Sequence, residues 1–392
     1  MGLLVLNAGS SGLKFTLLDD QGRSTLVDGE VAHQGPGPAE LIVRVPGRPD
    51  RREPCQAATS GEAASLAIRV ATEGGGTIRA IGHRVVHGGP RFVEGVLITP
   101  DLEAELAKLT ELAPLHNPPA LEAIEAAKRA RPEVPQVAAF DTSFFADLPR
   151  SAATYAVPRE WVEKYGIRRY GFHGLSHAYC AGEAARLLGR DPAGLRLVVC
   201  HLGNGASASA IRGGKPLDTT MGFTPLPGLV MGTRPGEVDP GILLYLMKVK
   251  GLTPDDLDDA LNHHSGLLGV SGVSADYRKV EEAAKGGDDR AKLALEVDAA
   301  RLRSSLGALA ATLGGLDAVV FAGGIGEHSA SLRAAACEGL EFLGLRLDPD
   351  KNDGAAPGSD VAEGGSPARI LVIHTREELM IAREVLRLVP MA

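Results

Sequence analysis

The sequence predicts an α/β protein built from two similar domains with mixed sheets. Two observations carry this prediction: apolar strands alternate with helical segments, and each half of the chain opens with a strand that runs into a Gly-rich hairpin turn. The length of 392 residues also suits two domains, because a domain usually holds about 100–200 residues.

The first hairpin lies at the start of the chain. Residues 3–6 and 13–18 are apolar runs on either side of the turn NAGSSG, and residues 25–31 read as a third strand. The second half repeats the plan: residues 195–200 run into HLGNG, and residues 206–212 return. We interpret the repeat as a duplicated domain.

Helices are expected between and after the hairpins. Thr99-Pro100 and Thr253-Pro254 have the N-cap–proline pattern of helix starts, and Asn117-Pro118 opens another helix. Further helices are predicted at 329–338 and 377–388, strands at 317–321 and 370–373, and a polar loop at 355–367.

Composition excludes several classes of protein. The 41 Lys+Arg and 49 Asp+Glu residues give a net charge of −8 without a basic run, which argues against nucleic acid and anionic membranes as partners. No stretch of about 18 residues is apolar enough to span a bilayer. The four cysteines are scattered and no signal peptide is evident, so we expect a cytoplasmic protein with reduced thiols.

The turn NAGSSGLK, residues 7–14, is a candidate anion site. Its backbone N–H groups and hydroxyls are closely spaced, Lys14 adds a positive charge, and Asn7 could hold a metal-bound water. The alternative is an ordinary Gly/Ser hairpin with a solvated lysine.

Two charged residues stand in strand-like, apolar surroundings. Arg84 in GHRVVHGG needs an anion, either a structural carboxylate or a ligand. The valines and glycines around it favour a strand over a helix that would put His83 and His87 on one face. Asp141 ends a strand-like run, where it could serve a metal or ligand or simply cap a turn.

The second half carries three further candidates. His173 in YGFHGLSH could be functional or a neutral core histidine. Arg234 lies in an irregular stretch at 219–240, and such long stretches are usually functional loops. The GGIGE segment at 323–327 would bring backbone close to a ligand at a helix N-terminus. P-loop, protein-kinase, HExxH and GxSxG motifs are absent.

Taken together and in this order, the segments resemble the acetate/propionate kinase family of the sugar kinase–Hsp70–actin superfamily. The resemblance runs from residue 2 to about residue 385 and rests on ten segments: NAGSSGLK, GHRVVHGG, LAPLHNPP, FDTSFF, YGFHGLSH, HLGNG, DTTMGFTPLPGLVMGTRPG, SGLLGVSG, FAGGIGEH and TREELMIA.

The resemblance implies duplicated actin-like (ribonuclease H-like) domains flanking a central cleft. The first domain would hold residues 1–146 plus 377–392 on the Mg²⁺ and phosphate side, because Glu377 must approach Asn7. Residues 147–376 would form the nucleotide-binding domain and the dimer contact. The implied reaction is reversible phosphoryl transfer from ATP to acetate, which gives acetyl phosphate and ADP with Mg²⁺, or Mn²⁺ in its place, in a homodimer.

The resemblance also implies roles for individual residues. Asn7 and Glu377 would support the metal, and Asp141, His173 and Arg234 would serve the transferring phosphoryl group. Arg84 would hold the substrate carboxylate beside an apolar pocket of Val86, Leu115 and Pro225. The nucleotide would be lined by Lys14, His201, Leu202, Gly203, Asn204, Gly205, Asp276, Tyr277, Arg278, Gly324, Ile325, Gly326, Glu327 and His328.

Chemistry limits the role of Asp141. Acetate is already ionised at pH 7 and has no proton to remove, so we expect Asp141 to position groups rather than act as a general base. The chain also departs from the family pattern at Gly12, His328, Pro235 and Glu237; at Gly12 a phosphate-side hydroxyl is missing.

The sequence leaves alternative functions open. Propionate could replace acetate, since one methylene in an apolar pocket is worth only about 1–3 kcal/mol. A sugar kinase or ATPase of the same superfamily would need polar pocket residues where Val86, Leu115 and Pro225 stand. A catalytically dead nucleotide-binding module would have lost charged site residues that are present here. A pyrophosphate donor in place of ATP is a further alternative.

Overall fold

The computed structural model describes residues 2–9, 12–32, 39–73, 76–113 and 116–390. The chain divides into two compact units, one of Met1–Ala146 with Arg376–Ala392 and one of Asp147–Thr375. We call them unit 1 and unit 2. Each unit is an α/β assembly around a mixed sheet, so the predicted fold class is confirmed.

Unit 1 contains an eight-stranded sheet in the order β5-β4-β3-β2-β1-β6-β8-β7. Strands β1 to β5 form an antiparallel meander, whereas β6 runs parallel to both β1 and β8. The strands are β1(Gly2–Gly9), β2(Gly12–Asp19), β3(Thr25–Ala32), β4(Ala39–Arg44), β5(Arg51–Cys55), β6(Ile78–Val85), β7(Val96–Leu97) and β8(Gln136–Phe140).

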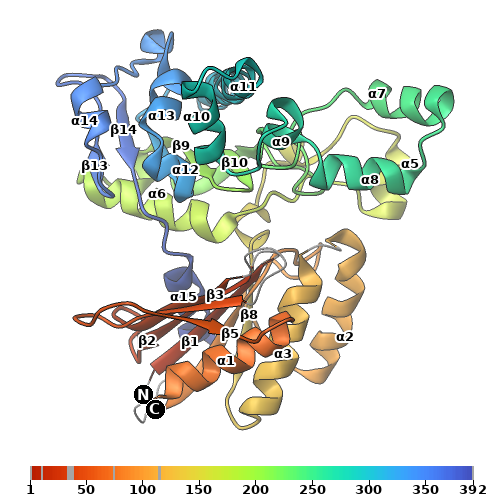
Figure 1. Cartoon of the computed structure of the whole chain (residues 1–392), viewed down its shortest axis with the longest axis vertical. Helices are drawn as coiled ribbons and strands as arrows, with labels where there is room; N and C mark the ends of the chain where they lie inside the picture. Colours follow the sequence, from red (N-terminus) through yellow and green to blue (C-terminus); the bar gives the residue numbers. More distant parts are fainter. Residues whose placement is uncertain (1, 10–11, 33–38, 74–75, 114–115, 391–392) are drawn as a thin grey trace. The chain divides into compact units, whose positions relative to one another are not determined.

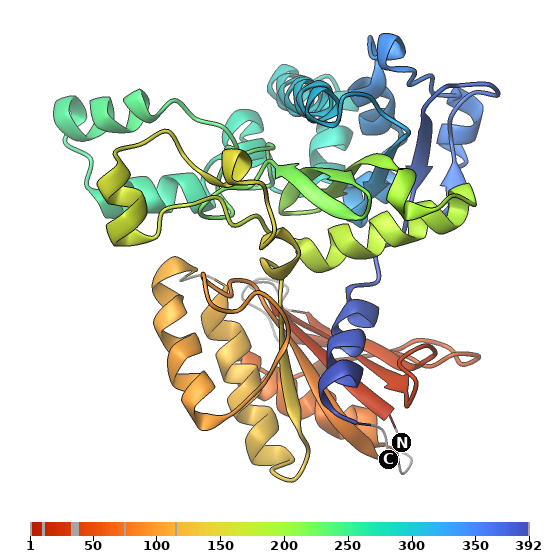
Figure 2. The ribbon, with the colours of Figure 1, turned by 180° about the vertical axis from the view of Figure 1, so that it is seen from behind.

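Helices cover both faces of this sheet. Its helical segments are α1(Ser60–Thr72), α2(Pro100–Lys108), η1(Leu109–Leu112), α3(Asn117–Ala130), η2(Ser143–Phe145) and α15(Glu377–Leu388). Helices α1 and α3 lie on one face and α15 on the other (Figures 1 and 2). Strand β1 is therefore buried on both sides, which explains its continuous apolar run.

Unit 2 contains a six-stranded sheet in the order β11-β10-β9-β12-β14-β13. Its antiparallel β9–β10–β11 meander continues into β12 and β14, which run parallel to β9. Unit 1 shows the same pattern in β3-β2-β1-β6-β8. The strands are β9(Arg196–Leu202), β10(Ala206–Arg212), β11(Lys215–Thr219), β12(Ala318–Ala322), β13(Ser359–Asp360) and β14(Arg369–Val372).

Helices α6 and α11 cover opposite faces of the unit 2 sheet (Figure 1). The segments are α4(Arg150–Ala153), α5(Arg159–Tyr165), α6(Gly174–Leu188), η3(Pro192–Gly194), α7(Pro240–Tyr245), the π-helical η4(Leu246–Lys250), α8(Pro254–His263), α9(Gly266–Ser271), α10(Tyr277–Lys285), α11(Asp289–Leu313), α12(Gly323–His328), α13(Ala330–Cys337), η5(Glu341–Leu343) and α14(Pro349–Asp353). None of the described helices is long and apolar enough to cross a membrane.

Local sequence signals fix several element ends. Thr99 and Thr253 cap α2 and α8 by accepting the backbone N–H of Leu102 (3.3 Å) and Asp256 (3.1 Å), as their N-cap patterns predict. The stretch between β11 and α7 holds no helix or strand, again as expected. The predicted loop at 355–367 is wrong in one detail, because β13 adds a short edge strand to β14 there.

Gly12 is required by the backbone of the β1–β2 hairpin. Its φ of +147° is unfavourable for residues with a side chain, and an added Cβ would lie 2.3 Å from the carbonyl oxygen of Val31. The absence of a hydroxyl at this position therefore follows from how β2 pairs with β3.

We predict that Gly12→Ser lowers the free energy of unfolding by more than the roughly 1–3 kcal/mol typical of a strained backbone position, because a steric clash adds to the conformational cost. Urea unfolding of the intact chain measures the change. Gly47→Ser is the matched control, since Gly47 also has positive φ (+77°) but nothing lies within 4 Å of its added Cβ. Equal losses in the two variants would contradict the clash.

Candidate active site

The ends of three unit 1 strands gather polar side chains. Asn7 lies near the end of β1, Arg84 near the end of β6, and Asp141 directly after β8. Because these strands run parallel, with Leu6 paired to His83 and Arg84 to Ala139, the three side chains come to one edge of the sheet. Helix α15 begins at the same edge with Glu377.

Arg84 joins these side chains into a cluster. Its Nε donates to Oδ1 of Asp141 at 3.1 Å, its Nη2 donates to the other carboxylate oxygen, and its Nη1 donates to Oδ1 of Asn7 at 3.1 Å. The amide of Asn7 in turn donates to Oε2 of Glu377 at 3.1 Å. We call Asn7, Arg84, Asp141 and Glu377 the arginine cluster.

The cluster lies mostly out of water. Asp141 is fully buried and the side chain of Arg84 is 15% exposed. Burial alone would lower the pKa of Arg84, but the charges of Asp141 and Glu377 and the hydrogen bond to Asp141 outweigh it and raise that pKa above its ordinary value. Arg84 is therefore a permanent cation, and Asp141 is its bidentate structural anion.

Oxygen atoms suited to a hard cation lie in the same cluster. The carboxylate of Glu377 and the amide oxygen of Asn7 are ligand types that Mg²⁺ prefers. Lys14 is exposed and lies directly opposite Asn7 on β2. Within the described residues no three His, Cys, Asp or Glu side chains form a metal-binding group, so water or phosphate oxygens would have to complete the coordination shell.

Of the predicted apolar pocket, Val86 is buried directly after β6 in unit 1, and Pro225 is part-buried in the irregular loop of unit 2. Leu115 lies outside the described residues.

A chain of side chains in unit 2 holds His173. Its Nδ1 is 2.9 Å from Oγ of Ser207, which is 2.8 Å from Nε2 of His177, and Nδ1 of His177 is 2.7 Å from Oγ of Ser209. Ser207 and Ser209 share one face of β10. Burial, with a smaller effect of His201, lowers the pKa of His177 to about 3, so the chain is neutral at its centre.

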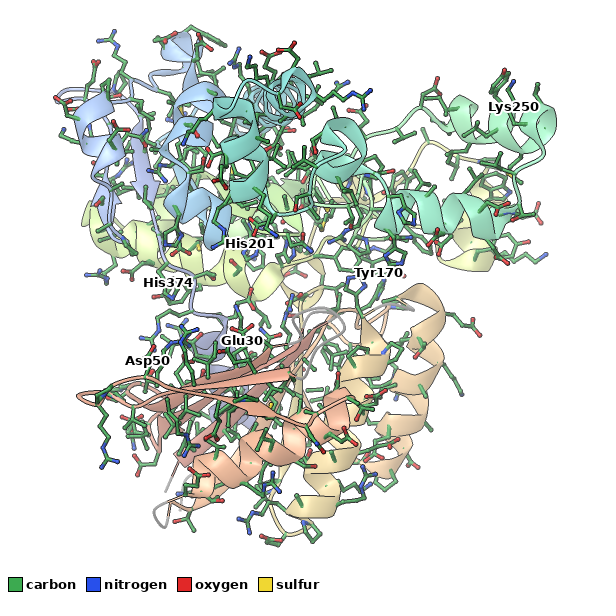
Figure 3. All side chains as sticks on the ribbon, viewed as in Figure 1. Glu30, Asp50, Tyr170, His201, Lys250 and His374 are labelled. Atoms are coloured by element: carbon green, nitrogen blue, oxygen red, sulfur yellow. The ribbon has the colours of Figure 1, made fainter. Side chains whose placement is uncertain are left out.

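His173 also has an unusual backbone. Its φ of +58° is the only positive φ at a non-glycine position in the part of the chain described. Such positions concentrate at functional sites. The His173 ring stacks on His201, with centroids 4.4 Å apart, and Oγ of Ser176 lies 2.7 Å from Nδ1 of His201. Figure 3 labels His201 at the end of β9.

Arg234 lies beside this group. A Cβ added to Gly205 would be 2.8 Å from Nη2 of Arg234 and 3.4 Å from Nε2 of His173, so the glycine leaves space where the two side chains converge. The guanidinium donates to the carbonyl oxygen of Pro225 at 2.7 Å. Burial lowers the pKa of Arg234 to about 10, which still leaves it charged at neutral pH.

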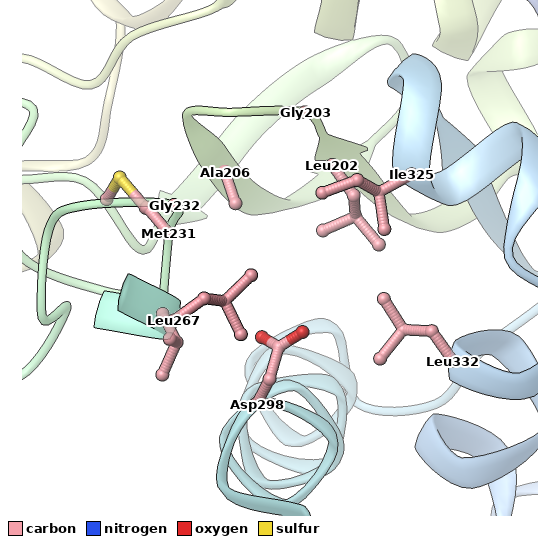
Figure 4. A pocket seen from close by; sticks show the side chains of 10 residues that line it. Leu202, Gly203, Ala206, Met231, Gly232, Leu267, Asp298, Ile325 and Leu332 are labelled. Atoms are coloured by element: carbon pink, nitrogen blue, oxygen red, sulfur yellow. The ribbon is translucent and has the colours of Figure 1, made fainter. Parts of the chain in front are cut away.

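A pocket opens next to the β9–β10 turn (Figure 4). Three predicted nucleotide residues line it, namely Leu202, Gly203 and Ile325. The sequence did not single out the remaining lining residues, which are Ala206, Val230, Met231, Gly232, Leu267, Asp298 and Leu332.

A buried arginine donates hydrogen bonds to the glycine segment that forms α12, directly before α13. Nη1 of Arg333 donates to the carbonyl oxygens of Gly326 and Glu327, both at 2.9 Å, and its Nε donates to Asn352. Gly323, with φ +77°, lies so close to Leu202 that a Cβ would be 2.7 Å from its carbonyl oxygen. These contacts fix α12 against the end of β9.

Several other predicted nucleotide residues have local structural contacts. Asp276 caps α10 and pairs with Arg278, while Tyr277 is buried. The buried carboxylate of Glu327 meets His374 at 2.8 Å, and Nδ1 of His328 meets the carbonyl oxygen of Gly324 at 2.9 Å. None of these side chains lines the pocket of Figure 4.

Solved structures with this fold define a class of enzyme. An acetate kinase from Porphyromonas gingivalis superposes with a TM-score of 0.88 at 38% identity, covering 98% of this chain and 99% of that one. A propionate kinase from Francisella tularensis gives a TM-score of 0.91 at 38% identity, covering 99% and 100%. The class is that of phosphotransferases with a carboxyl group as acceptor.

Sequence comparison makes the assignment specific. A model of the Acetokinase family matches residues 2–383. Curated acetate kinases from Cyanothece sp. and Clostridioides difficile are 47% and 45% identical, each alignment covering 99% of this chain and 98% and 100% of the relative. The chain belongs to the Acetokinase family.

Proposed function

We propose that this protein transfers the γ-phosphoryl group of ATP reversibly to acetate, which gives acetyl phosphate and ADP. The observation that carries the proposal is the arginine cluster: a permanently charged guanidinium, able to hold a carboxylate, lies beside oxygen atoms that suit Mg²⁺. Membership of the Acetokinase family supports it.

Arg84 binds the carboxylate of acetate and orients it for attack. Asp141 and Asn7 already fix the guanidinium plane, so little rotamer entropy is lost when the substrate binds. Val86 is buried next to Arg84 in sequence and supplies an apolar contact for the methyl group.

The nucleotide binds through unit 2. The base enters the pocket of Figure 4, and the predicted nucleotide residues of the β9–β10 turn, α10 and α12 contact the rest of the molecule. Asn7 and Glu377 hold Mg²⁺, or Mn²⁺ in its place. When bound, the metal neutralises charge on the phosphate oxygens.

His173 and Arg234 stabilise the transferring phosphoryl group. Charge spreads over its three equatorial oxygens during in-line transfer, so fixed donors and cations lower the barrier. The Ser207–His177–Ser209 chain fixes the His173 ring, and the carbonyl of Pro225 orients Arg234.

Acyl-phosphate formation tests the proposal. Purified protein with ATP and Mg²⁺ is given acetate, propionate or butyrate, and the product is trapped with hydroxylamine. We expect acetate to give the highest kcat/KM and propionate to fall roughly 10–200-fold below it, as one methylene in a small apolar pocket allows.

Two results of this assay would change the conclusion. A higher kcat/KM with propionate than with acetate would leave the proposed reaction type unchanged. The preferred substrate would then be propionate, as the name of the Francisella tularensis relative states for that protein. Acyl phosphate from none of the acids, with either ATP or pyrophosphate as donor and folded protein, would overturn the proposal.

Asp141 acts on the reaction through Arg84, so we predict that Asp141→Asn lowers kcat/KM about 10²-fold or more without removing either limb of the pH–rate profile. The amide keeps the shape of the side chain and one acceptor for Arg84 but loses the charge. Asp50→Asn, at an exposed carboxylate of unit 1, is the control. Loss of one limb with intact Mg²⁺ dependence would instead identify Asp141 as a general base.

The protein is a homodimer in this proposal, and the lobe of unit 2 formed by α5, α7, η4 and α8 is the contact (Figures 1 and 2). Apolar side chains there are about half exposed, which is unusual for a monomer surface. They are Trp161, Tyr165, Ile242, Leu244, Tyr245, Met247 and Val249.

Sedimentation of a charge variant checks the dimer. Val249→Glu, at a side chain that is 61% exposed, should shift the sedimenting species from dimer to monomer, because the carboxylate would be buried at the contact. Val93→Glu, 51% exposed in unit 1, should leave the dimer intact. A wild-type monomer, or a dimer unaffected by Val249→Glu, would contradict this contact.

The free cysteines fit a cytoplasmic location. Cys55, Cys180, Cys200 and Cys337 form no disulfide, as expected in a reducing compartment that also holds ATP.

A further inference from the structure

A chain of two hydrogen bonds in unit 2 connects Thr375 to His201. The hydroxyl of Thr375 donates to Oγ of Ser176 at 2.8 Å, and Oγ of Ser176 lies 2.7 Å from Nδ1 of His201. Thr375 is the last residue of unit 2, and Ser176 lies in the first turn of α6. The segment that leaves unit 2 is therefore hydrogen-bonded, through one serine, to a predicted nucleotide residue.

The sheet of unit 2 brings these residues together. Strands β9, β12 and β14 are parallel neighbours, so His201 near the end of β9 and Thr375 after β14 come to the same edge. Helix α6 packs on β9 and β12, and its Ser176 is fully buried. Nδ1 of His374, labelled in Figure 3, is 2.8 Å from Oε2 of Glu327 and so holds the segment before Thr375 on α12.

The direction of the first hydrogen bond decides the second. A hydroxyl group has one hydrogen and two lone pairs. Because Ser176 accepts from Thr375, its own hydrogen can go to Nδ1 of His201. A neutral imidazole that accepts at Nδ1 carries its proton on Nε2. In the other tautomer Ser176 would accept twice, and its buried hydrogen would lose this acceptor at a cost in free energy.

Nε2 of His201 faces the β9–β10 turn, since a Cβ added to Gly203 would lie 3.8 Å from it. The ring stacks on His173, which converges with Arg234 at Gly205. Under the proposed function, on which this inference rests, this turn contacts the nucleotide, and His173 and Arg234 meet the transferring phosphoryl group. A hydrogen on Nε2 suits phosphate oxygens, whereas an unprotonated nitrogen would repel them.

We propose that Thr375 is a positioning residue for phosphoryl transfer. Through Ser176 it fixes the tautomer of His201, so that the Nε2–H group donates to a phosphate oxygen of the bound nucleotide. Thr375 acts on the reaction through two hydrogen bonds, and what it contributes is a hydroxyl group. Serine can therefore replace it, and valine cannot.

The kinetic test removes the hydroxyl of Thr375. At pH 8.5 with saturating acetate, Thr375→Val should lower kcat about tenfold, as loss of one buried hydrogen bond allows. KM for acetate should not change, because Arg84 of unit 1 holds the acetate. Thr375→Ser should restore kcat, and Ser176→Ala should lower it at least as much as Thr375→Val. Thr312→Val is the matched control, since the exposed hydroxyl of Thr312 only donates to a backbone carbonyl of α11.

Acid distinguishes a tautomer effect from a packing defect. A doubly protonated imidazole has a hydrogen on both nitrogens, so His201 should also donate from Nε2 in Thr375→Val at pH 5.5, and the loss in kcat should shrink to about twofold. His173, His177 and Arg234 lie near this ring in both proteins, so the ratio of wild type to variant removes their contribution. The same loss at both pH values, or equal losses in Thr375→Val and Thr375→Ser, would overturn the proposal.

Histidine NMR separates this inference from the proposed function. Long-range ¹H–¹⁵N correlation of protein labelled with ¹⁵N-histidine reports which ring nitrogen carries the proton, without any turnover. We expect His201, assigned from the spectrum of His201→Gln, to carry its proton on Nε2 at pH 8.5 in the wild-type protein and to become a mixture of tautomers in Thr375→Val.

Two NMR results would overturn the role of Thr375. One is a proton on Nδ1 of His201 in the wild-type protein, which decides the matter even if the variants fail to fold. The other is an unchanged tautomer in Thr375→Val. If no nucleotide supports acyl-phosphate formation, the proposed function fails, while the spectrum still shows whether Thr375 sets the tautomer.

Discussion

The buried ion pair between Arg84 and Asp141 is the interaction on which the site of unit 1 depends. Two charges lose much of their hydration here, and the loss is offset because the geometry is bidentate and Arg84 makes a further hydrogen bond to Asn7. The amide oxygen of Asn7 accepts a hydrogen bond from Arg84, and the amide nitrogen of Asn7 donates one to Glu377. The parallel register of β1, β6 and β8 makes this possible, since it brings three strand ends to one edge.

Unit 2 also contains a buried ionisable side chain, but its hydrogen-bond partners are neutral. His177 is buried, and two serines of β10 lie within hydrogen-bond distance of its two ring nitrogens. Its low pKa keeps the ring uncharged, so it orients His173 without adding charge to the site. Unit 1 thus fixes its central side chain through a buried ion pair, whereas unit 2 fixes His173 through a buried neutral histidine, each on the same arrangement of strands.

Much of this could be predicted from the sequence because the signals are local. The Gly-rich turns predicted both hairpins, and the threonine–proline pairs predicted two helix starts. The family resemblance predicted that Glu377 approaches Asn7. The alternatives for Arg84 also resolve in part, since it does hold a structural carboxylate, Asp141.

Other features depend on register and packing that no local pattern encodes. Ser207 and Ser209 look like ordinary strand residues until β10 is placed beside α6. Asp298 could have been found, because it occupies a position on α11 where the neighbouring turns carry Ala294 and Leu302, and a carboxylate in such a row is unusual. The need for glycine at position 12 appears only when β2 is paired with β3.

The placement of α15 has a consequence for how the protein is made. Unit 1 consists of two segments that flank unit 2 in the sequence, and Ile381 and Val385 of α15 pack against the backbone of β6 at Gly82. Domains usually fold in order from the N-terminus during synthesis. Here all of unit 2 is synthesised between the two segments of unit 1, so the arginine cluster gains Glu377 only after unit 2 has been made. Unit 1 thus completes its own fold later than unit 2 can, although β1 precedes every strand of unit 2 in the chain.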